Sequence, residues 1–266
     1  MSSSRIARRS RTGGRFAAWI LAVLTAFAAC RTLAADLRVL CPSALREPVL
    51  ELARSFARAS GQRVEFIFAS VGAVHKRIAS GERADLAIGT SEGIEALVRL
   101  GPGIDGTQAV IARSALALAA RPGALALDVA GREAVVRALS SARSIAAPDP
   151  RAGVPGGAQV AELFDALQLT EDLQPRIRWL LDPREAAKRV ASGEVELAVA
   201  AMNDLVGAAG VEVAGPIAEP MTRAITYAAV ISRSATDRDR ARAFIDHLRA
   251  KEAANVFRRA GYVSAQ

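Results

Sequence analysis

The fold of this chain is decided by residues 37–90, which read LRVLCPSALREPVLELARSFARASGQRVEFIFASVGAVHKRIASGERADLAIGT. Three short apolar runs typical of strands alternate with two segments whose apolar residues recur at the period of a helix. The apolar runs lie at 37–41, 64–68 and 84–88, and the helical segments at 44–59 and 71–80. This alternation predicts parallel strands joined by helices that cover the sheet.

A ligand-binding crevice is expected at one edge of this sheet, because such sheets bind ligands beyond the carboxyl ends of their strands. The turns at 41–44, 68–72 and 89–91 all fall at that edge. Each turn opens a helix, and the first amides of a helix have no partner within it and favour an anionic group. The sequence therefore predicts an anion-binding crevice.

The alternation starts again after residue 113 and predicts a second α/β lobe. A loop rich in proline and glycine, DPRAGVPGG at 149–157, interrupts it and precedes a helix. Strands are expected at 115–120, 144–147, 177–181, 195–200 and 225–232, and helices at 132–142, 158–167, 183–192, 237–250 and 252–260.

Residues 1–35 have the three parts of an export signal. The first fifteen residues carry arginines and no acid, residues 16–29 read FAAWILAVLTAFAA, and small residues lead to Ala35. A membrane-spanning helix needs about 20 apolar residues, which makes an uncleaved anchor the weaker alternative. We expect a cleaved signal peptide and a periplasmic protein.

The same segment offers a second processing site. Residues 27–30 read FAAC and resemble a bacterial lipobox, although the aromatic first residue is atypical. Cleavage there would leave Cys30 as a lipidated N-terminus. Cleavage near Ala35 would leave Cys41 alone, so that no intramolecular disulfide could form.

Charge argues against nucleic acid as a partner. The formal net charge is +8, but six basic residues and no acid precede Asp36. The rest of the chain has 29 basic and 27 acidic residues. A nearly neutral protein has no strong electrostatic attraction for a polyanion.

An enzyme interpretation rests on Cys41 as nucleophile and His75 as base. The alternative is a small buried apolar residue at the end of a strand, which we favour for Cys41. The sequence contains no Gly-x-Ser-x-Gly motif, P-loop or metal-spaced group of His and Cys. We expect no catalytic residues, no metal and no cofactor.

Five phrases, in order along the chain, resemble the type II periplasmic solute-binding proteins of ABC transporters, and in particular the molybdate-binding-protein-like group. They are VLCPSALREPVLELARSFARASG, VEFIFASVGAVHKRIASGERADLAIGT, APDPRAGVPGGAQVAELFDALQL, REAAKRVASGEVELAVAAMNDLV and AAVISRSATDRDRARAFIDHLRAKEAANVFRRAGY. The resemblance implies two doubly wound α/β lobes joined by a two-strand hinge, with residues 36–113 and 227–266 in lobe 1 and 114–226 in lobe 2. Closure of the lobes would bury the ligand and present a closed form to a membrane permease.

The resemblance also implies a set of ligand-binding positions. The two serines that grip an oxyanion in the family align at Ala44 and Val71, with Ser43 and Ser70 one residue earlier. A backbone donor in the second lobe aligns at Gly156, beside Gly157, and we add Arg184 and Asn203 as polar residues at helix starts. Another donor position falls on Pro183, which has no N–H, and the family tyrosine aligns at Ala201.

These departures leave the ligand open. A buried oxyanion with two charges needs nearly all its oxygens paired, and several of the family's donors are shifted or missing. Arg184 suits a carboxylate, because a guanidinium can bind it through two hydrogen bonds. We expect a monomer that binds molybdate, tungstate or an organic acid and works with an ABC permease. Ser43, Ser70 and Asn203 are alternatively helix caps, Gly156 and Gly157 a simple turn, and Arg184 a solvated residue.

Overall fold

The structure is a computed structural model that describes residues 36–154 and 156–263. From Asp36 onwards the chain packs as one compact unit. The predicted signal peptide at 1–35 and the alternative lipidation at Cys30 lie outside the described residues.

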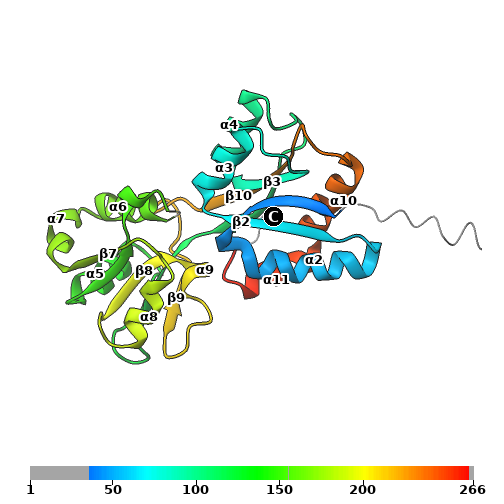
Figure 1. The fold of residues 1–266 in the computed structure, drawn as a ribbon. Coiled ribbons are helices and arrows are strands. Elements are labelled where there is room, and N and C mark those ends of the chain that lie inside the picture. Colours follow the sequence, from blue (N-terminus) through cyan, green and yellow to red (C-terminus); the bar gives the residue numbers. More distant parts are fainter. Residues whose placement is uncertain (1–35, 155, 264–266) are drawn as a thin grey trace, which may run out of the picture. The chain divides into compact units, whose positions relative to one another are not determined.

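The first of two five-stranded sheets has the order β2-β1-β3-β10-β4 (Figure 1). Strand β1 pairs in parallel with β2 and β3, whereas β10 runs antiparallel to both β3 and β4. The sheet therefore contains one strand that returns from much later in the sequence. The strands span Leu37–Pro42 (β1), Val64–Ala69 (β2), Leu86–Thr90 (β3), Ala109–Ser114 (β4) and Ile225–Ile231 (β10).

Helices cover both faces of this sheet because each has one apolar stripe to bury. Helices α2 (Arg46–Ser60), α10 (Arg238–Arg249) and α11 (Lys251–Arg259) pack on one face around Phe56, Phe244 and Phe257. Helices α3 (Val71–Ala79) and α4 (Ser91–Leu100) pack on the other, through a separate core cluster.

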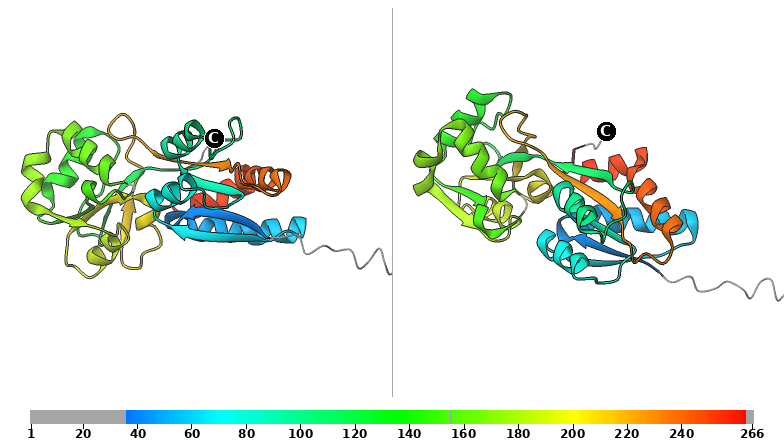
Figure 2. Two further views of the ribbon diagram at one scale, coloured as in Figure 1. Left: turned by 45° about the horizontal axis from the view of Figure 1, so that its top comes forward. Right: turned by 90° about the horizontal axis from the view of Figure 1, so that it is seen from above.

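The second sheet repeats this plan with the order β7-β6-β8-β5-β9 (Figure 2). Its strands are Leu116–Ala120 (β5), Ile145–Pro148 (β6), Ile177–Leu180 (β7), Leu197–Ala201 (β8) and Glu212–Ala214 (β9). Helices α5 (Arg132–Ser141), α6 (Gly157–Leu167) and α7 (Thr170–Leu173) cover one face, and α8 (Glu185–Ala191) and α9 (Met202–Leu205) the other. The three short 3-10 turns are η1 (Ser43–Leu45), η2 (Pro150–Ala152) and η3 (Gln174–Arg176).

The predicted doubly wound α/β fold is confirmed, and so is the parallel pairing predicted for the strands of residues 37–90. No direction was predicted for β10 in the first sheet and β5 in the second, which run antiparallel to their neighbours. These strands lie where the chain passes between the sheets, at Ala115 and after Ala214. The short elements β4, β9 and α7 were not predicted, whereas the helix expected at Asn203 is present as α9.

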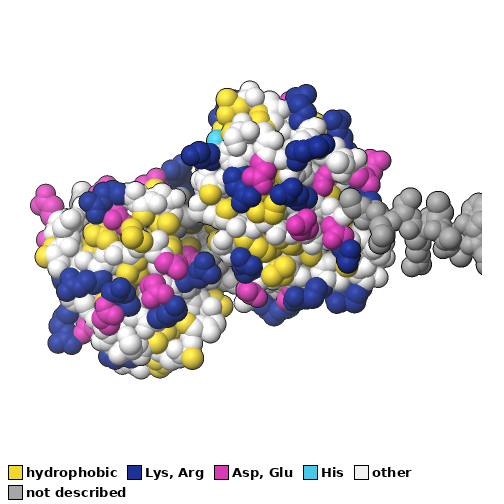
Figure 3. Space-filling view, viewed as in Figure 1, with side chains coloured by type: hydrophobic (Ala, Val, Ile, Leu, Met, Phe, Trp, Pro, Cys, Tyr) yellow, Lys and Arg dark blue, Asp and Glu magenta, His cyan; other side chains and the backbone are white. Residues whose placement is uncertain are grey.

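The surface is consistent with the nearly neutral charge of residues 36–266. On the face drawn in Figure 3, Lys and Arg side chains are interspersed with Asp and Glu. Within the described ranges, no helix is both long and apolar enough to cross a membrane.

Candidate functional site

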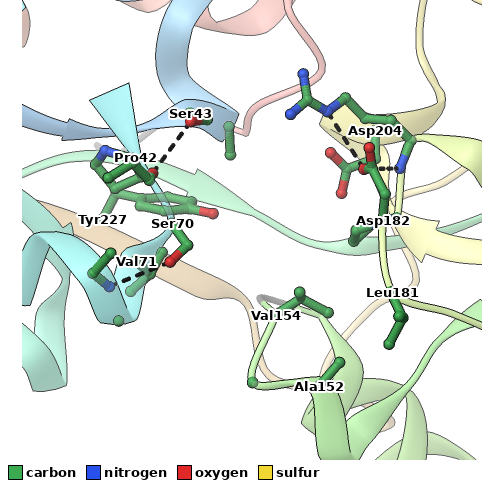
Figure 4. Close-up of a pocket in the computed structure, with 17 residues that line it drawn as sticks. Pro42, Ser43, Ser70, Val71, Ala152, Val154, Leu181, Asp182, Asp204 and Tyr227 are labelled. Atoms are coloured by element: carbon green, nitrogen blue, oxygen red, sulfur yellow. Dashed lines mark hydrogen bonds and ion pairs between the residues drawn. The ribbon is translucent and has the colours of Figure 1, made fainter. Parts of the chain in front are cut away.

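A cavity of about 470 Å³ is lined by residues from the loops of both sheets. The first sheet contributes the segments after β1 and β2 and one residue of β10, and the second contributes the loops after β6, β7 and β8 (Figure 4). The lining residues with polar side chains are Ser43, Ser70, Asp182, Arg184, Asp204 and Tyr227. The edge predicted from residues 37–90 therefore faces this cavity, apart from the turn at 89–91.

Ser43 and Ser70 have different hydrogen-bonding roles. The Ser43 hydroxyl donates to the carbonyl oxygen of Ala69 at 3.2 Å, and it does not cap η1. The Ser70 hydroxyl accepts from the amide of Ala73 at 3.3 Å and caps α3. The proton of Ser43 is thus in use, whereas that of Ser70 is free to donate to a ligand.

The start of α3 supplies further donors. The first bond within this helix runs from the amide of Val74 to the carbonyl oxygen of Ser70. The amides of Val71 and Gly72 precede that bond, and both residues line the cavity. Helix geometry leaves such amides without a helical partner.

Tyr227 was not predicted from the sequence as a site residue. It lies on β10 opposite Thr90 of β3, and only 1% of its surface is exposed. The pairing of β10 with β4 is irregular between Tyr227 and Ala228, and such bulges re-aim side chains. Figure 4 shows its hydroxyl directed into the cavity. Burial raises the pKa of this phenol, so it enters the site as a neutral hydroxyl.

Asp204, on α9, was also missed. Burial raises the pKa of its carboxyl to about 7, against the lowering influence of Arg184, while Asp182 acts in the raising direction. The side-chain amide of Asn203 donates to Asp204 Oδ1 at 3.1 Å. A carboxyl with this pKa is partly ionised at neutral pH.

Arg184 and Asp182 form an exposed ion pair at the edge of the cavity. Arg184 Nε lies 3.6 Å from Asp182 Oδ1, which also accepts from the Arg184 amide at 3.1 Å. More than half of each side chain is solvent-exposed. Part of the positive charge that Arg184 brings to the site is therefore offset by Asp182.

The structure brings five of the eight predicted site residues to the cavity. Ser43, Ala44, Ser70, Val71 and Arg184 line it. The other three do not line it.

Two of these three belong to the loop before α6. Gly156 caps this helix with φ +91°, and the amide of Gly157 donates to the carbonyl oxygen of Val154. In their place, Ala152, Gly153 and Val154 line the cavity.

Asn203 lines a smaller adjoining cavity of about 180 Å³ that also contacts Arg46 and Tyr262. Asn203 does not cap α9, because it lies inside the helix and accepts from the Ser114 hydroxyl. It is therefore linked to the end of β4.

Cys41 is unsuited to act as a nucleophile. Its side chain is fully buried, and its thiol donates only a weak bond to the carbonyl oxygen of Pro42 at 3.5 Å. Burial raises the pKa of the thiol, which keeps it protonated. Neither Cys41 nor His75 lines the cavity. Among the residues that the structure describes, no group of three or more His, Cys, Asp or Glu is placed to hold a metal ion.

Comparison with protein families identifies the group to which this architecture belongs. The family model of the bacterial extracellular solute-binding proteins matches residues 37–263. The chain belongs to this family. The resemblance to type II periplasmic binding proteins of the molybdate-binding group is thereby confirmed, together with its two-sheet α/β fold.

Individual members of the family differ in what they are named for. An aconitate isomerase of Pseudomonas sp. is 25% identical over 230 residues, covering 85% of this chain and 86% of its own. The molybdate-binding protein of Azotobacter vinelandii is 25% identical over 251 residues, covering 91% and 96%. Its solved structure has a TM-score of 0.68 over 87% of this chain and all of that chain.

The fold is also shared with a structure of lower sequence identity. A substrate-binding domain assigned to a molybdenum ABC transporter of Clostridium difficile has a TM-score of 0.77 at 19% identity, covering 87% of this chain and 99% of its own. At this identity the likeness concerns the fold alone. The relatives found are mostly solute-binding proteins, and one carries the name of an enzyme.

Proposed function

We propose that this protein captures a small organic acid in the cavity between its two sheets and delivers it to an ABC permease in the bacterial membrane. The observation that carries the proposal is the cavity itself, whose lining comes from the loops of both sheets and includes hydroxyls, helix amides and Arg184. The protein acts as a monomer in the periplasm, and its signal peptide occupies residues 1–35.

The two sheets are proposed to form the lobes of a hinged clamp. Residues 36–113 and 227–266 make one lobe and 114–226 the other, so that the hinge contains the crossings near Ala115 and before Ile225. Because both lobes supply lining residues, closure adds contacts to a bound ligand and stabilises the closed form.

An organic acid suits the cavity better than molybdate does. Molybdate carries two negative charges and presents only acceptors, and the lining holds two carboxyl groups, Asp182 and Asp204, with one guanidinium. The tyrosine expected at position 201 is replaced by a buried alanine, and Pro183 has no amide hydrogen to donate. An unpaired charge in a cleft costs several kcal/mol.

Ligand-induced stabilisation tests this proposal. The purified protein is melted alone and with millimolar molybdate, tungstate, sulfate or a panel of mono-, di- and tricarboxylates. A ligand that binds only the folded state raises the midpoint by mass action. We expect a shift with at least one carboxylate and none with the metal oxyanions. A shift with molybdate alone would show that the ligand is a metal oxyanion.

A second candidate function is an isomerase that moves a proton within an unsaturated carboxylic acid. It is favoured by Asp204, a carboxyl in the cavity with a pKa of about 7, and by the relative named aconitate isomerase. Ionised Asp204 would remove a proton from one carbon, the double bond would shift, and the proton would return to the far carbon of the allylic unit. No electrons are gained or lost.

Nuclear magnetic resonance in deuterated water tests this second function. The protein is incubated with cis- or trans-aconitate, and the isomers and deuterium incorporation are followed with time. Isomerisation that is lost in Asp204→Asn but kept in Cys41→Ala would establish it. No change in either isomer above the protein-free rate would rule it out for these acids.

A further inference from the structure

We propose that the cavity selects a carboxylic acid that also bears a hydrogen-bond donor, a hydroxyl or an ammonium, on a neighbouring carbon, and that Asp204 and Tyr227 determine this specificity. The inference rests on the proposed function and names the class of ligand for the same site. It follows from how donors and acceptors are divided around the cavity.

Donors gather at the start of α3. The amides of Val71 and Gly72 precede the first bond of the helix, and the hydroxyl of Ser70 keeps its proton because its oxygen accepts from Ala73. Ser70, Val71 and Gly72 all line the cavity. Two amides and a hydroxyl suit a carboxylate group.

Acceptors gather elsewhere in the lining. The Ser43 hydroxyl already donates a hydrogen bond to the carbonyl oxygen of Ala69, so it can only accept a hydrogen bond from a ligand. Asp204 Oδ1 accepts a hydrogen bond from the side-chain amide of Asn203, and no described residue donates to Asp204 Oδ2. Figure 4 draws Asp204 across the cavity from Ser43 and Tyr227.

Tyr227 is the second observation that points to a ligand. It is packed in the core with 1% of its surface exposed, and its ring meets that of Tyr262 at 6.0 Å between centroids. Within the described part of the chain its hydroxyl has no hydrogen-bond partner, although it lines the cavity. The hydroxyl is the part of this buried side chain that reaches the cavity, so a ligand there is expected to supply its hydrogen-bond partner.

A ligand with acceptors alone cannot satisfy this arrangement. A plain carboxylate would fill the donors at α3 but would leave Asp204 and Ser43 without a proton to accept. A hydroxyl or ammonium beside the carboxylate supplies that proton, and a hydroxyl can in turn accept from Tyr227. Sites built for a polar group discriminate strongly against analogues that lack it.

Isothermal titration calorimetry of the purified protein at pH 8 tests the inference with matched ligands. Propionate is compared with L-lactate and L-alanine, and succinate with L-malate and L-aspartate. We expect at least tenfold tighter binding for one substituted acid over its parent, and the preferred substituent distinguishes a hydroxyl from an ammonium.

Variants show whether the named residues carry the preference. Asp204→Asn and Tyr227→Phe should each reduce it at least fivefold, whereas Asp246→Asn, on the exposed side of α10, should leave it unchanged. Thermal melts verify that each variant is folded. A preference that survives in both Asp204→Asn and Tyr227→Phe would overturn the assignment of these residues.

The ligand series separates failure of this inference from failure of the proposed function. Equal binding of parent and substituted acids would overturn the inference while the proposed function stands. Failure of every carboxylate to bind would overturn both.

Discussion

The hydroxyl of Tyr262 donates a hydrogen bond to the carbonyl oxygen of Ala44 at 2.7 Å. Tyr262 follows α11 at the end of the described chain, and Ala44 lies in η1 at the cavity. The bond therefore ties the C-terminal segment to a loop of the proposed binding site, across 218 positions of sequence.

Removal of this hydroxyl should destabilise the protein. Tyr262 is 2% exposed, so Tyr262→Phe leaves the Ala44 carbonyl without its partner. Such a loss costs about 1–3 kcal/mol, measurable by urea unfolding. Tyr227→Phe is the matched control, because its hydroxyl has no partner among the described residues, and its effect should stay within about 0.5 kcal/mol. Equal losses in the two variants would contradict the different roles assigned to these tyrosines.

Asp204 should make the protein less stable as the pH rises. Its ordinary pKa is 3.8 and burial raises it to about 7, so between these values the folded state holds a proton that the unfolded state has released. Stability from this group is fully present below a pH of about 4 and is lost as the pH rises through 7. The charged or titratable groups that line the two cavities with it are Arg46, Glu47, Asp182, Arg184, Tyr227 and Tyr262.

Asp204→Asn isolates this effect, because asparagine does not titrate. The free energy of unfolding of the variant minus that of the unmutated protein should grow from pH 4 to pH 8. The difference between the folded pKa of about 7 and the ordinary pKa of 3.8 limits this pH-dependent gain in the free energy of unfolding to roughly 4 kcal/mol. Asp246→Asn, at an exposed site, should give a difference that is flat with pH. A flat difference for Asp204→Asn would show that its carboxyl titrates normally.

Ligand affinity should change with pH in the opposite direction. If Asp204 accepts a proton-bearing group of the ligand, its ionised form binds best, and the affinity for the preferred substituted acid should rise about tenfold from pH 6 to pH 8. Calorimetry at several pH values measures this, and buffers of different ionisation enthalpy report the released proton. An affinity that falls over this range would indicate that protonated Asp204 donates to the ligand instead.

The strands and helices were largely predictable because they depend on local patterns. Strand β1 and helix α2 show their apolar period within a few turns of sequence, and the parallel pairing of β1 with β2 and β3 follows from their alternation with helices. The antiparallel strand β10 is recognisable only as a strand, since its partners β3 and β4 lie more than a hundred residues earlier.

The site was harder to predict because its key side chains acquire their properties from tertiary contacts. Tyr227 stands inside the apolar run ITYAAVI, and its direction depends on the bulge between β10 and β4. Asp204 looks like an ordinary acid in a short helix, and its pKa is raised by burial and by the nearby Asp182, both of which depend on the fold. Ser43 and Ser70 could be predicted from the sequence because each directly follows a strand, and the carboxyl ends of parallel strands lie at the same edge of a sheet.

Cys41 should be unreactive in the folded protein. It is fully buried, and its raised pKa keeps the thiol protonated. Thiol reagents react with the nucleophilic thiolate and only slowly with the thiol. In a Cys30→Ser background, a chromogenic disulfide reagent at pH 8 should modify Cys41 only when urea unfolds the chain. Rapid modification of the native protein would revive the nucleophile interpretation.

Gly261 is expected to be intolerant of any side chain. Its φ is +81°, and a Cβ there would lie 2.8 Å from the Cα of Asn203 and 2.9 Å from the carbonyl oxygen of Met202. These contacts are to backbone atoms of α9, which cannot rotate away. Gly261→Ala should therefore force the C-terminal segment away from α9 and cost more than about 2 kcal/mol.

Gly81 is the matched control for Gly261, because it has a similar φ of +88° but a Cβ there would have no atom within 4 Å. Gly81→Ala should cost only the backbone strain of about 1 kcal/mol. Urea unfolding of the two variants separates strain from close contact. Equal losses would mean that α9 and the C-terminal segment do not meet closely at Gly261.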